Sequence, residues 1–202
     1  MSTKIQKDDL SIAILSGGKS SRMGYEDKGL IKLNGFSVLS RIVKLCYKYS
    51  NDVFIITNNN LEEYKKLHPH LHTDILDNYQ GPLSGIYTAL SKCKNKHVII
   101  LPCDGPFVKE DYFEKLINYG EEHNILVVKT GDRLQPVYAR LASSLKENLK
   151  EFLETGERKI DKWYNACGYK DIRFEQSDEM FININSKDDI EKNRFLINKL
   201  YG

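Results

Sequence analysis

The chain has 202 residues, 41% of them hydrophobic and 29% charged, which suits one globular domain with a sizeable core. Thirty Lys and Arg against 28 Asp and Glu leave a formal net charge of +2. This near balance argues against a dedicated nucleic-acid coat and against a polybasic membrane binder, so any positive site has to be local.

The amino-terminal sequence and the cysteines are typical of a cytosolic protein. The first residues, MSTKIQKDDL, carry charges where a signal peptide would be apolar, and no apolar run reaches the roughly 18 residues of a membrane span. The four cysteines are widely spaced without a CxxC pair, which indicates neither a zinc site nor a disulfide framework. We expect a cytoplasmic chain with reduced thiols, one domain over residues 1–202 and flexibility in residues 1–9.

Four short β-rich runs predict the first strands of a sheet: Ser11–Leu15, Asp52–Thr57, Thr73–Leu76 and His97–Leu101. Their near-continuous hydrophobicity suits strands covered on both faces of a parallel sheet. Helical spacing predicts helices at 38–47 and 83–90, and a further helix after Lys109 precedes a strand at 125–129. The alternation predicts an α/β fold with a Rossmann-like, doubly wound, mostly parallel sheet flanked by helices.

The pattern changes after Thr130. The sequence GDRLQPVYARL predicts a turn and a short strand, residues 142–153 a helix, and GERKIDKWY the start of another. We then expect a strand at Met180–Ile184 and a closing helix with Ser186 as its N-cap. We find no domain linker, internal repeat or low-complexity tract, which argues against solenoids and disordered scaffolds.

The loop after the first strand, LSGGKSSRMGYEDKG, has the composition of an anion-binding loop. Gly17 and Gly18 lack side chains, so their N–H groups can approach phosphate oxygens, while Arg22 and Lys28 can neutralise a triphosphate. The loop fits neither GxxxxGK[ST] nor GxGxxG. The alternative is an ordinary strand-to-helix turn with exposed basic residues.

Other candidates also follow strands. Asp104 comes directly after the run HVIILPC, so a parallel sheet would bring its carboxylate to the same edge as the glycine loop. Asp77 follows TDIL and could equally be a turn residue. Asn183 and Asn185 would share one face of a strand, although asparagines at a strand end are often only structural.

The histidine-rich stretch HPHLH, with His68, His70 and His72, resembles a metal tract in composition. Pro69 prevents a regular helical pair, and no Cys or carboxylate completes a ligand spacing. A polar surface loop is therefore the preferred interpretation.

The glycine loop resembles the signature of nucleotidyltransferases that activate a phosphorylated compound with an NTP, Leu-x-Gly-Gly-x-x-x-Arg-Met-Gly-x-x-x-Lys. The matching residues are Leu15, Gly17, Gly18, Arg22, Met23, Gly24 and Lys28. Within that superfamily the chain is most similar to the molybdenum cofactor guanylyltransferase family, from about Ser11 to Ile190. Further matches are the segments 81–85, 102–104, 156–158 and 183–185.

The resemblance implies a fold of the nucleotide-diphospho-sugar transferase type and transfer of GMP from GTP to molybdopterin or its molybdenum form, with release of pyrophosphate. It implies Arg22, Lys28 and Asp104 as catalytic residues, with Mg²⁺ held by Asp104. The implied nucleotide-binding residues are Leu15, Ser16, Gly17, Gly18, Lys28, Asp77 and Asp104. The amino-terminal part would bind the nucleotide, and residues from about 130 to 190 would face the second substrate.

For the second substrate, the resemblance implies Gly81, Pro82, Arg158, Asn183 and Asn185. Arg158 would meet the terminal phosphate of molybdopterin, and the alternative for it is an exposed charge at a helix start. Proteins that deliver the cofactor, and the molybdoenzymes that receive it, are the implied protein partners.

Three departures from the family pattern stand in or near the loop: Tyr25 in place of a second glycine, Ser16 in place of alanine, and Gly105 in place of a larger residue, which we expect to loosen the aim of Asp104. The alternatives in the same class are a cytidylyltransferase for the same cofactor and a sugar-phosphate nucleotidyltransferase. A GTP-binding cofactor carrier is the alternative outside enzymes.

Overall fold

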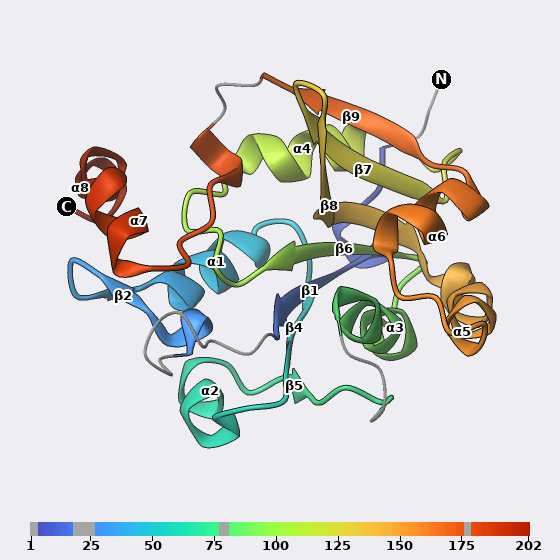
Figure 1. The fold of residues 1–202 in the computed structure, drawn as a ribbon, viewed down its shortest axis with the longest axis horizontal. Helices are drawn as coiled ribbons and strands as arrows, with labels where there is room; N and C mark the ends of the chain where they lie inside the picture. Colours follow the sequence, from blue (N-terminus) through green and yellow to red (C-terminus); the bar gives the residue numbers. More distant parts are fainter. Residues whose placement is uncertain (1–3, 18–26, 77–80, 176–178) are drawn as a thin grey trace.

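A sheet of seven strands in the order β5-β4-β1-β6-β8-β7-β9 forms the centre of the protein in a computed structural model (Figure 1). The structure describes residues 4–17, 27–76, 81–175 and 179–202. The strands are β1 (Leu10–Ser16), β4 (Asp52–Thr57), β5 (Leu71–His72), β6 (His97–Pro102), β7 (Ile125–Thr130), β8 (Arg133–Ala142) and β9 (Lys170–Phe174). Strand β8 is antiparallel to both of its neighbours, and the remaining pairs are parallel. The predicted mostly parallel α/β sheet is confirmed.

The central strands are hydrophobic throughout because both of their faces are covered. In β6, Ile99 and Leu101 belong to one buried cluster, whereas Val98 and Ile100 belong to the other. Successive side chains of a strand point to opposite faces, so a run such as HVIIL supplies both cores at once.

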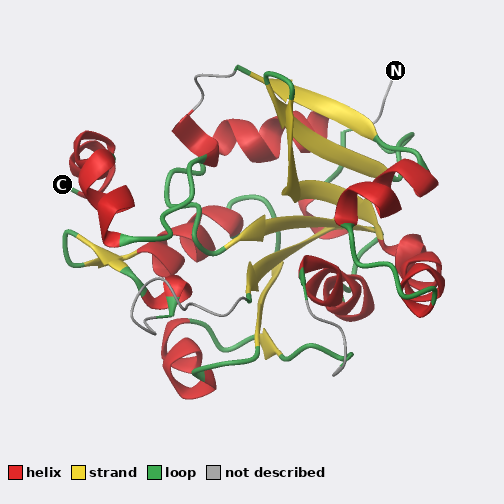
Figure 2. Ribbon diagram, viewed as in Figure 1, coloured by secondary structure: helices red, strands yellow, loops and turns green. Residues whose placement is uncertain are grey.

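Helices lie on both sides of this sheet (Figure 2). The first cluster includes residues of α1 (Val38–Cys46), α2 (Leu61–Leu67), α4 (Glu110–Asn118) and α8 (Arg194–Tyr201). The second includes residues of α3 (Pro82–Lys92), α5 (Lys146–Glu154) and α6 (Ile160–Cys167). Helix α7 (Lys187–Lys192) has Ser186 as its N-cap, as predicted, and the Ser186 side chain accepts from the N–H of Asp189.

Short elements complete the described chain. A hairpin of β2 (Lys32–Leu33) and β3 (Phe36–Ser37) precedes α1. The 3-10 turns are η1 (Lys7–Asp9), η3 (Lys28–Leu30), η4 (Ser143–Leu145) and η5 (Glu179–Phe181). All four cysteines are free, as expected, and none of the described helices has the length and apolar content to span a lipid bilayer.

Two predicted strands are wrong. Residues 73–76 form no strand, because side chains bind their backbone: Asp74 N–H donates to Asn58, and Ile75 N–H donates to Thr88. The pairing with β4 is made instead by β5, immediately before them. Residues 180–184 contain the end of η5 followed by irregular chain, although Ile184 is buried as a strand residue would be.

Candidate functional site

The carboxyl ends of β1 and β6 lie side by side and bring two of the predicted segments together. Leu15 pairs with Pro102, and the N–H of Cys103 donates to the carbonyl of Leu15 at 3.0 Å. Gly17 and Asp104 therefore leave the sheet at the same edge, where open α/β sheets bind their ligands. The described atoms leave open space at Gly17, since a Cβ there would have no neighbour within 4 Å.

Three predicted residues meet at this edge. The amine of Lys28, in the first position of η3, lies 3.6 Å from Oδ2 of Asp104 and donates a hydrogen bond to Oδ1 of Asn185. The Lys28 side chain is 30% exposed and that of Asp104 is 15% exposed. The amine is thus held by a carboxylate and an amide while solvent still reaches it.

The second carboxylate oxygen of Asp104 is the strongest sign of a ligand. Oδ1 is buried and has no hydrogen-bond partner among the described residues. Burial raises the pKa of Asp104, and the charge of Lys28 opposes that rise. A buried carboxylate oxygen without a partner is costly, so it points to a group that binds there.

The chemistry of Asp104 fits Mg²⁺, which prefers carboxylate oxygens and usually completes its shell with waters and substrate phosphates. In the part of the chain that the structure describes, no three His, Cys, Asp or Glu side chains gather as a metal cage. One carboxylate beside a phosphate-bearing substrate is sufficient for this ion.

The segment around Asp104 is fixed from several sides. Its carbonyl accepts from the N–H of Ile184 at 2.9 Å, and the carbonyl of Pro106 accepts from both Arg41 and the hydroxyl of Tyr201.

A Cβ at Gly105 would overlap the hydroxyl of buried Tyr138. The expected loosening at Gly105 is therefore wrong, because glycine here permits close packing.

Asn183 and Asn185 flank Asp104 from irregular chain and not from the predicted strand. Oδ1 of Asn183 accepts a hydrogen bond from the Tyr138 hydroxyl at 3.4 Å. The N–H of Asn185 donates to Oδ2 of Asp189 at 2.9 Å, which anchors this segment to the start of α7. Both amides thus lie near the sheet edge, although the strand expected to bring them together is not formed.

Gly81 and Pro82 open α3. Gly81 has φ +115°, a backbone conformation that favours glycine, and Pro82 occupies the first turn. A Cβ at Gly85 would lie 3.5 Å from the side chain of Leu15. The first turn of α3 therefore packs against the end of β1.

Arg158 lies between α5 and α6. Its Nη1 donates to the carbonyls of Leu153 and Glu157 at 2.8 and 2.7 Å. Part of the guanidinium therefore closes this turn, and the predicted role with a substrate phosphate stays a prediction. Gly18, Arg22 and Asp77 lie outside the described residues, as does Tyr25.

Sequence reasoning missed two residues that contact the Lys28 segment, Asp27 and Tyr64. Asp27 caps η3, and Tyr64 of α2 donates its hydroxyl proton to Asp27. The Asp before Lys28 could have been predicted as a helix cap, because Asp is a common capping residue. Nothing in the sequence connects Tyr64, in a mostly polar helix, with this site.

The histidine-rich stretch differs from expectation. His68 is 2% exposed, and its Nε2 lies 2.8 Å from the carbonyl of Val53. Burial lowers the pKa of His68. A surface loop is therefore the wrong description for His68, which packs in the core, while His70 is exposed.

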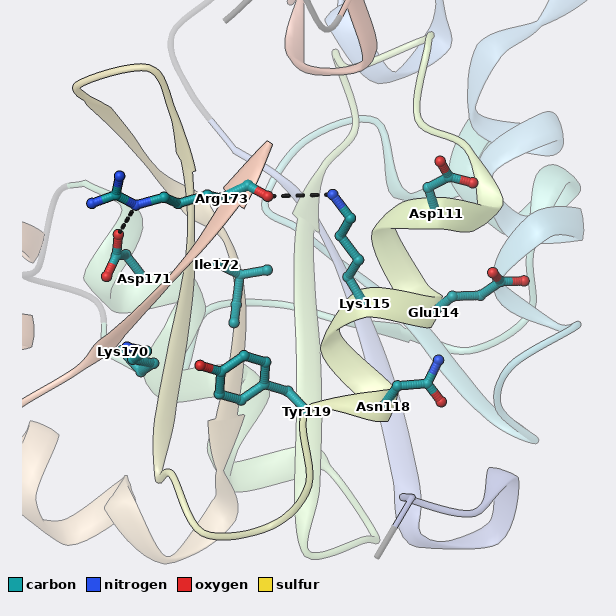
Figure 3. Close-up of a pocket in the computed structure, with 9 residues that line it drawn as sticks. All are labelled: Asp111, Glu114, Lys115, Asn118, Tyr119, Lys170, Asp171, Ile172 and Arg173. Atoms are coloured by element: carbon teal, nitrogen blue, oxygen red, sulfur yellow. Dashed lines mark hydrogen bonds and ion pairs between the residues drawn. The ribbon is translucent and has the colours of Figure 1, made fainter. Parts of the chain in front are cut away.

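A groove of about 770 Å³ lies elsewhere, between α4 and β9 (Figure 3). Charges of both signs line it, including Asp111, Glu114 and Lys115 from α4 and Arg173 from β9. The Lys115 amine donates across it to the carbonyl of Arg173 at 3.3 Å. Its lining includes none of the residues at the ends of β1 and β6.

Comparison with known proteins agrees with this geometry. The family model of the MobA-like NTP transferase domain matches residues 12–169. The chain is 35% identical over 185 residues to the molybdenum cofactor guanylyltransferase of Haemophilus influenzae (strain 86-028NP), covering 91% of this chain and 96% of the relative. It is 33% identical to the enzyme of that name from Vibrio atlanticus (strain LGP32), covering 89% and 93%.

The fold also matches a solved structure. Molybdopterin-guanine dinucleotide biosynthesis protein A from Archaeoglobus fulgidus has a TM-score of 0.75 and 22% identity, covering 94% of this chain and 99% of that one. Fold, sheet edge and family model together define a nucleotidyltransferase. The chain belongs to the family of MobA-like NTP transferases.

Proposed function

We propose that this protein transfers GMP from GTP to molybdopterin, or to its molybdenum-bearing form, and releases pyrophosphate. The observation that carries the proposal is the Lys28 amine held between Asp104 and Asn185 at the ends of β1 and β6. The relatives named molybdenum cofactor guanylyltransferase support the choice of substrates.

In this reaction an oxygen of the terminal phosphate of molybdopterin attacks the α-phosphorus of GTP. The bond between the α-phosphorus and its bridging oxygen breaks, and that oxygen leaves with pyrophosphate. The attacking phosphate is already ionised, so it needs little help from a general base, and no covalent protein nucleophile is required.

The residues at this sheet edge carry the charges that this nucleotidyl transfer needs. Asp104 would hold Mg²⁺ through its unpartnered oxygen, and the bound ion would neutralise negative charge on the triphosphate. Lys28, together with Arg22 of the glycine loop, would stabilise charge on the triphosphate and the departing pyrophosphate. Asn185 accepts a hydrogen bond from the Lys28 amine and so would help to orient it before substrate arrives.

The nucleotide contacts are assigned to the amino-terminal part, through Leu15, Ser16, Gly17, Gly18 and Asp77. The second substrate is assigned to the side formed by residues of about 130 to 190 and the start of α3. There we place Gly81, Pro82, Arg158, Asn183 and Asn185 as candidate contacts. The product would pass to molybdoenzymes, directly or through a delivery protein.

The test is nucleotide choice. Purified protein with Mg²⁺ and molybdopterin is given GTP, CTP or ATP in turn, and pyrophosphate and dinucleotide product are measured together. The proposal expects equal amounts of both with GTP and little with the others. Product with CTP alone would move the protein to the cytidylyl activity, and no product with any of the three nucleotides would contradict molybdopterin as the second substrate.

A further inference from the structure

A chain of hydrogen-bonded polar groups, buried at Tyr64 and Ser16 and half-buried at Asp27, contacts the turn η3 that begins with Lys28. Tyr64, which is fully buried, donates its hydroxyl proton to Oδ1 of Asp27 at 2.6 Å. The same hydroxyl forms a hydrogen bond with Oγ of Ser16, at the end of β1. Because the single proton of Tyr64 goes to a carboxylate, Ser16 must be the donor in the second bond.

The carboxylate of Asp27 connects this chain to the backbone that carries Lys28. Its Oδ1 also accepts from the N–H of Gly29 at 3.0 Å, so Asp27 caps η3 at the residue before Lys28. Its Oδ2 accepts from Nδ2 of Asn60 at 3.0 Å. The cap therefore sets the direction in which η3 leaves Asp27, and with it the origin of the Lys28 side chain.

The packing of Gly29 shows how closely this turn is held. A Cβ at Gly29 would overlap the Tyr64 hydroxyl and lie 2.6 Å from Oγ of Ser16. The turn thus packs directly on the two hydroxyl groups, and we expect a shift of Tyr64 to displace it.

The Tyr64 hydroxyl is suited to hold a position and not to transfer a proton. Burial raises the pKa of Tyr64 far above its ordinary value. The group therefore remains protonated and keeps donating to Asp27.

We infer that Tyr64 is a positioning residue for nucleotidyl transfer: through Asp27 it fixes the turn that aims the Lys28 amine at Asp104 and the triphosphate. The inference rests on the proposed role of Lys28. It gives α2, which contributes none of Lys28, Asp104 and Asn185, an indirect effect on the turnover step.

The test combines Tyr64→Phe with Lys28→Met. In the otherwise wild-type chain, Tyr64→Phe is expected to lower kcat about 10-fold with KM for GTP changed less than about 2-fold, because misplacing a charge-stabilising group affects the transition state more than binding. In the Lys28→Met background the same change should lower kcat less than about 2-fold, because the group that Tyr64 aims is gone.

Tyr112→Phe is the matched control. Tyr112 is also fully buried, and its hydroxyl donates to the carbonyl of Ile100 at 2.6 Å. Its loss should destabilise the protein to a similar extent while leaving kcat within about 2-fold. An equal loss of kcat in Tyr112→Phe, or an equal effect of Tyr64→Phe with and without Lys28, would overturn the inference.

Asn60→Gly covers the case in which Tyr64→Phe does not fold. Asn60 is exposed and has φ +50°, a conformation that glycine adopts freely, so only the bond to Asp27 is lost. It should lower kcat about 2- to 4-fold, again only when Lys28 is present. Wild-type kcat in Asn60→Gly would then overturn the inference.

A readout without turnover separates this inference from the proposed function. Amide hydrogen exchange at Gly29 reports its bond to Asp27 and should accelerate in Tyr64→Phe but not in Tyr112→Phe. Unchanged exchange at Gly29 would contradict the positioning role. If the wild-type protein forms no product while Gly29 exchange is faster in Tyr64→Phe and unchanged in Tyr112→Phe, only the proposed reaction is contradicted.

Discussion

Lys28 and Asn185 stand 157 positions apart in the chain, yet the lysine amine donates a hydrogen bond to the asparagine amide oxygen. This bond connects the segment after β1 with the segment before α7, and Asp104, just beyond the end of β6, lies 3.6 Å from the same amine. Three distant segments therefore define one charged position at the sheet edge, and the predictions below test its parts.

Lys28→Met should lower kcat/KM for GTP by about 10² to 10³, because it removes a preorganised positive group from the developing charge of the transition state. Steady-state kinetics with GTP and molybdopterin measures this loss. Lys48→Met is the control, since Lys48 forms an exposed ion pair with Glu110 and contacts neither Asp104 nor Asn185. If the two variants behave alike, Lys28 has no specific role.

Asp104→Asn should separate stability from activity. Burial disfavours the charged form of Asp104, so the neutral isostere should leave the melting temperature of the metal-free protein equal or higher. The same variant should lose magnesium-dependent turnover and the rise in melting temperature that Mg²⁺ with GTP gives the wild type. Retained magnesium stabilisation in Asp104→Asn would place the ion elsewhere.

Arg140→Met should destabilise the fold strongly although it lies in no proposed contact with substrate. Arg140 is fully buried, and its guanidinium donates to backbone carbonyls at and after the end of α4, those of Leu116, Gly120 and His123. Leaving these carbonyls without donors should cost about 2 to 5 kcal/mol in the free energy of unfolding, measured with urea.

The matched control is Arg173→Met, which removes an arginine that is 78% exposed and pairs with Asp171. Its effect should stay within about 0.5 kcal/mol, as for other surface ion pairs. A similar cost for the two variants would contradict the account of Arg140.

The free energy of unfolding should fall as the pH drops below about 6.5. His97 is buried, and burial together with the charge of Arg140 lowers its pKa below 6.5, while Lys96 acts in the same direction and Glu121 and Asp9 act against it. The unfolded chain then binds more protons than the folded one, so acid favours unfolding.

His97→Gln should reduce this slope. Urea unfolding at pH 7.5 and at pH 5.5 checks it, with about 1.4 kcal/mol per pH unit as the limit for one group. His68, whose pKa burial also lowers, accounts for part of the remaining slope. An unchanged slope in His97→Gln would show that His97 does not titrate as described.

The parts of the fold that the sequence predicts correctly are those set by local hydrophobic pattern. The strands β1, β4 and β6 and the helix α1 have continuous or helically spaced apolar residues, and the structure confirms them within one residue or so at each end. Residues 73–76 are apolar enough for a strand, but Asn58 and Thr88 bind their backbone groups, and no sequence pattern predicts such tertiary bonds.

The candidate site is likewise predicted from the sequence only where local pattern determines it. Lys28 and Asp104 can be placed at one edge from the order of strands alone, because both follow parallel strands. The buried orphan oxygen of Asp104, the Tyr138 hydroxyl packed on Gly105 and the Tyr64 bond to Asp27 depend on side chains brought from distant elements. These contacts decide the aim of the charged groups, and they become visible only in three dimensions.

The fate of labelled phosphorus tests the central claim most directly. Protein, Mg²⁺ and molybdopterin are incubated in parallel with GTP labelled at the α- or at the γ-phosphorus, and the products are separated. The account predicts that the α label enters the molybdopterin dinucleotide and the γ label leaves in pyrophosphate. Transfer of the γ label to molybdopterin, or release of labelled orthophosphate with GDP, would contradict nucleotidyl transfer by this protein.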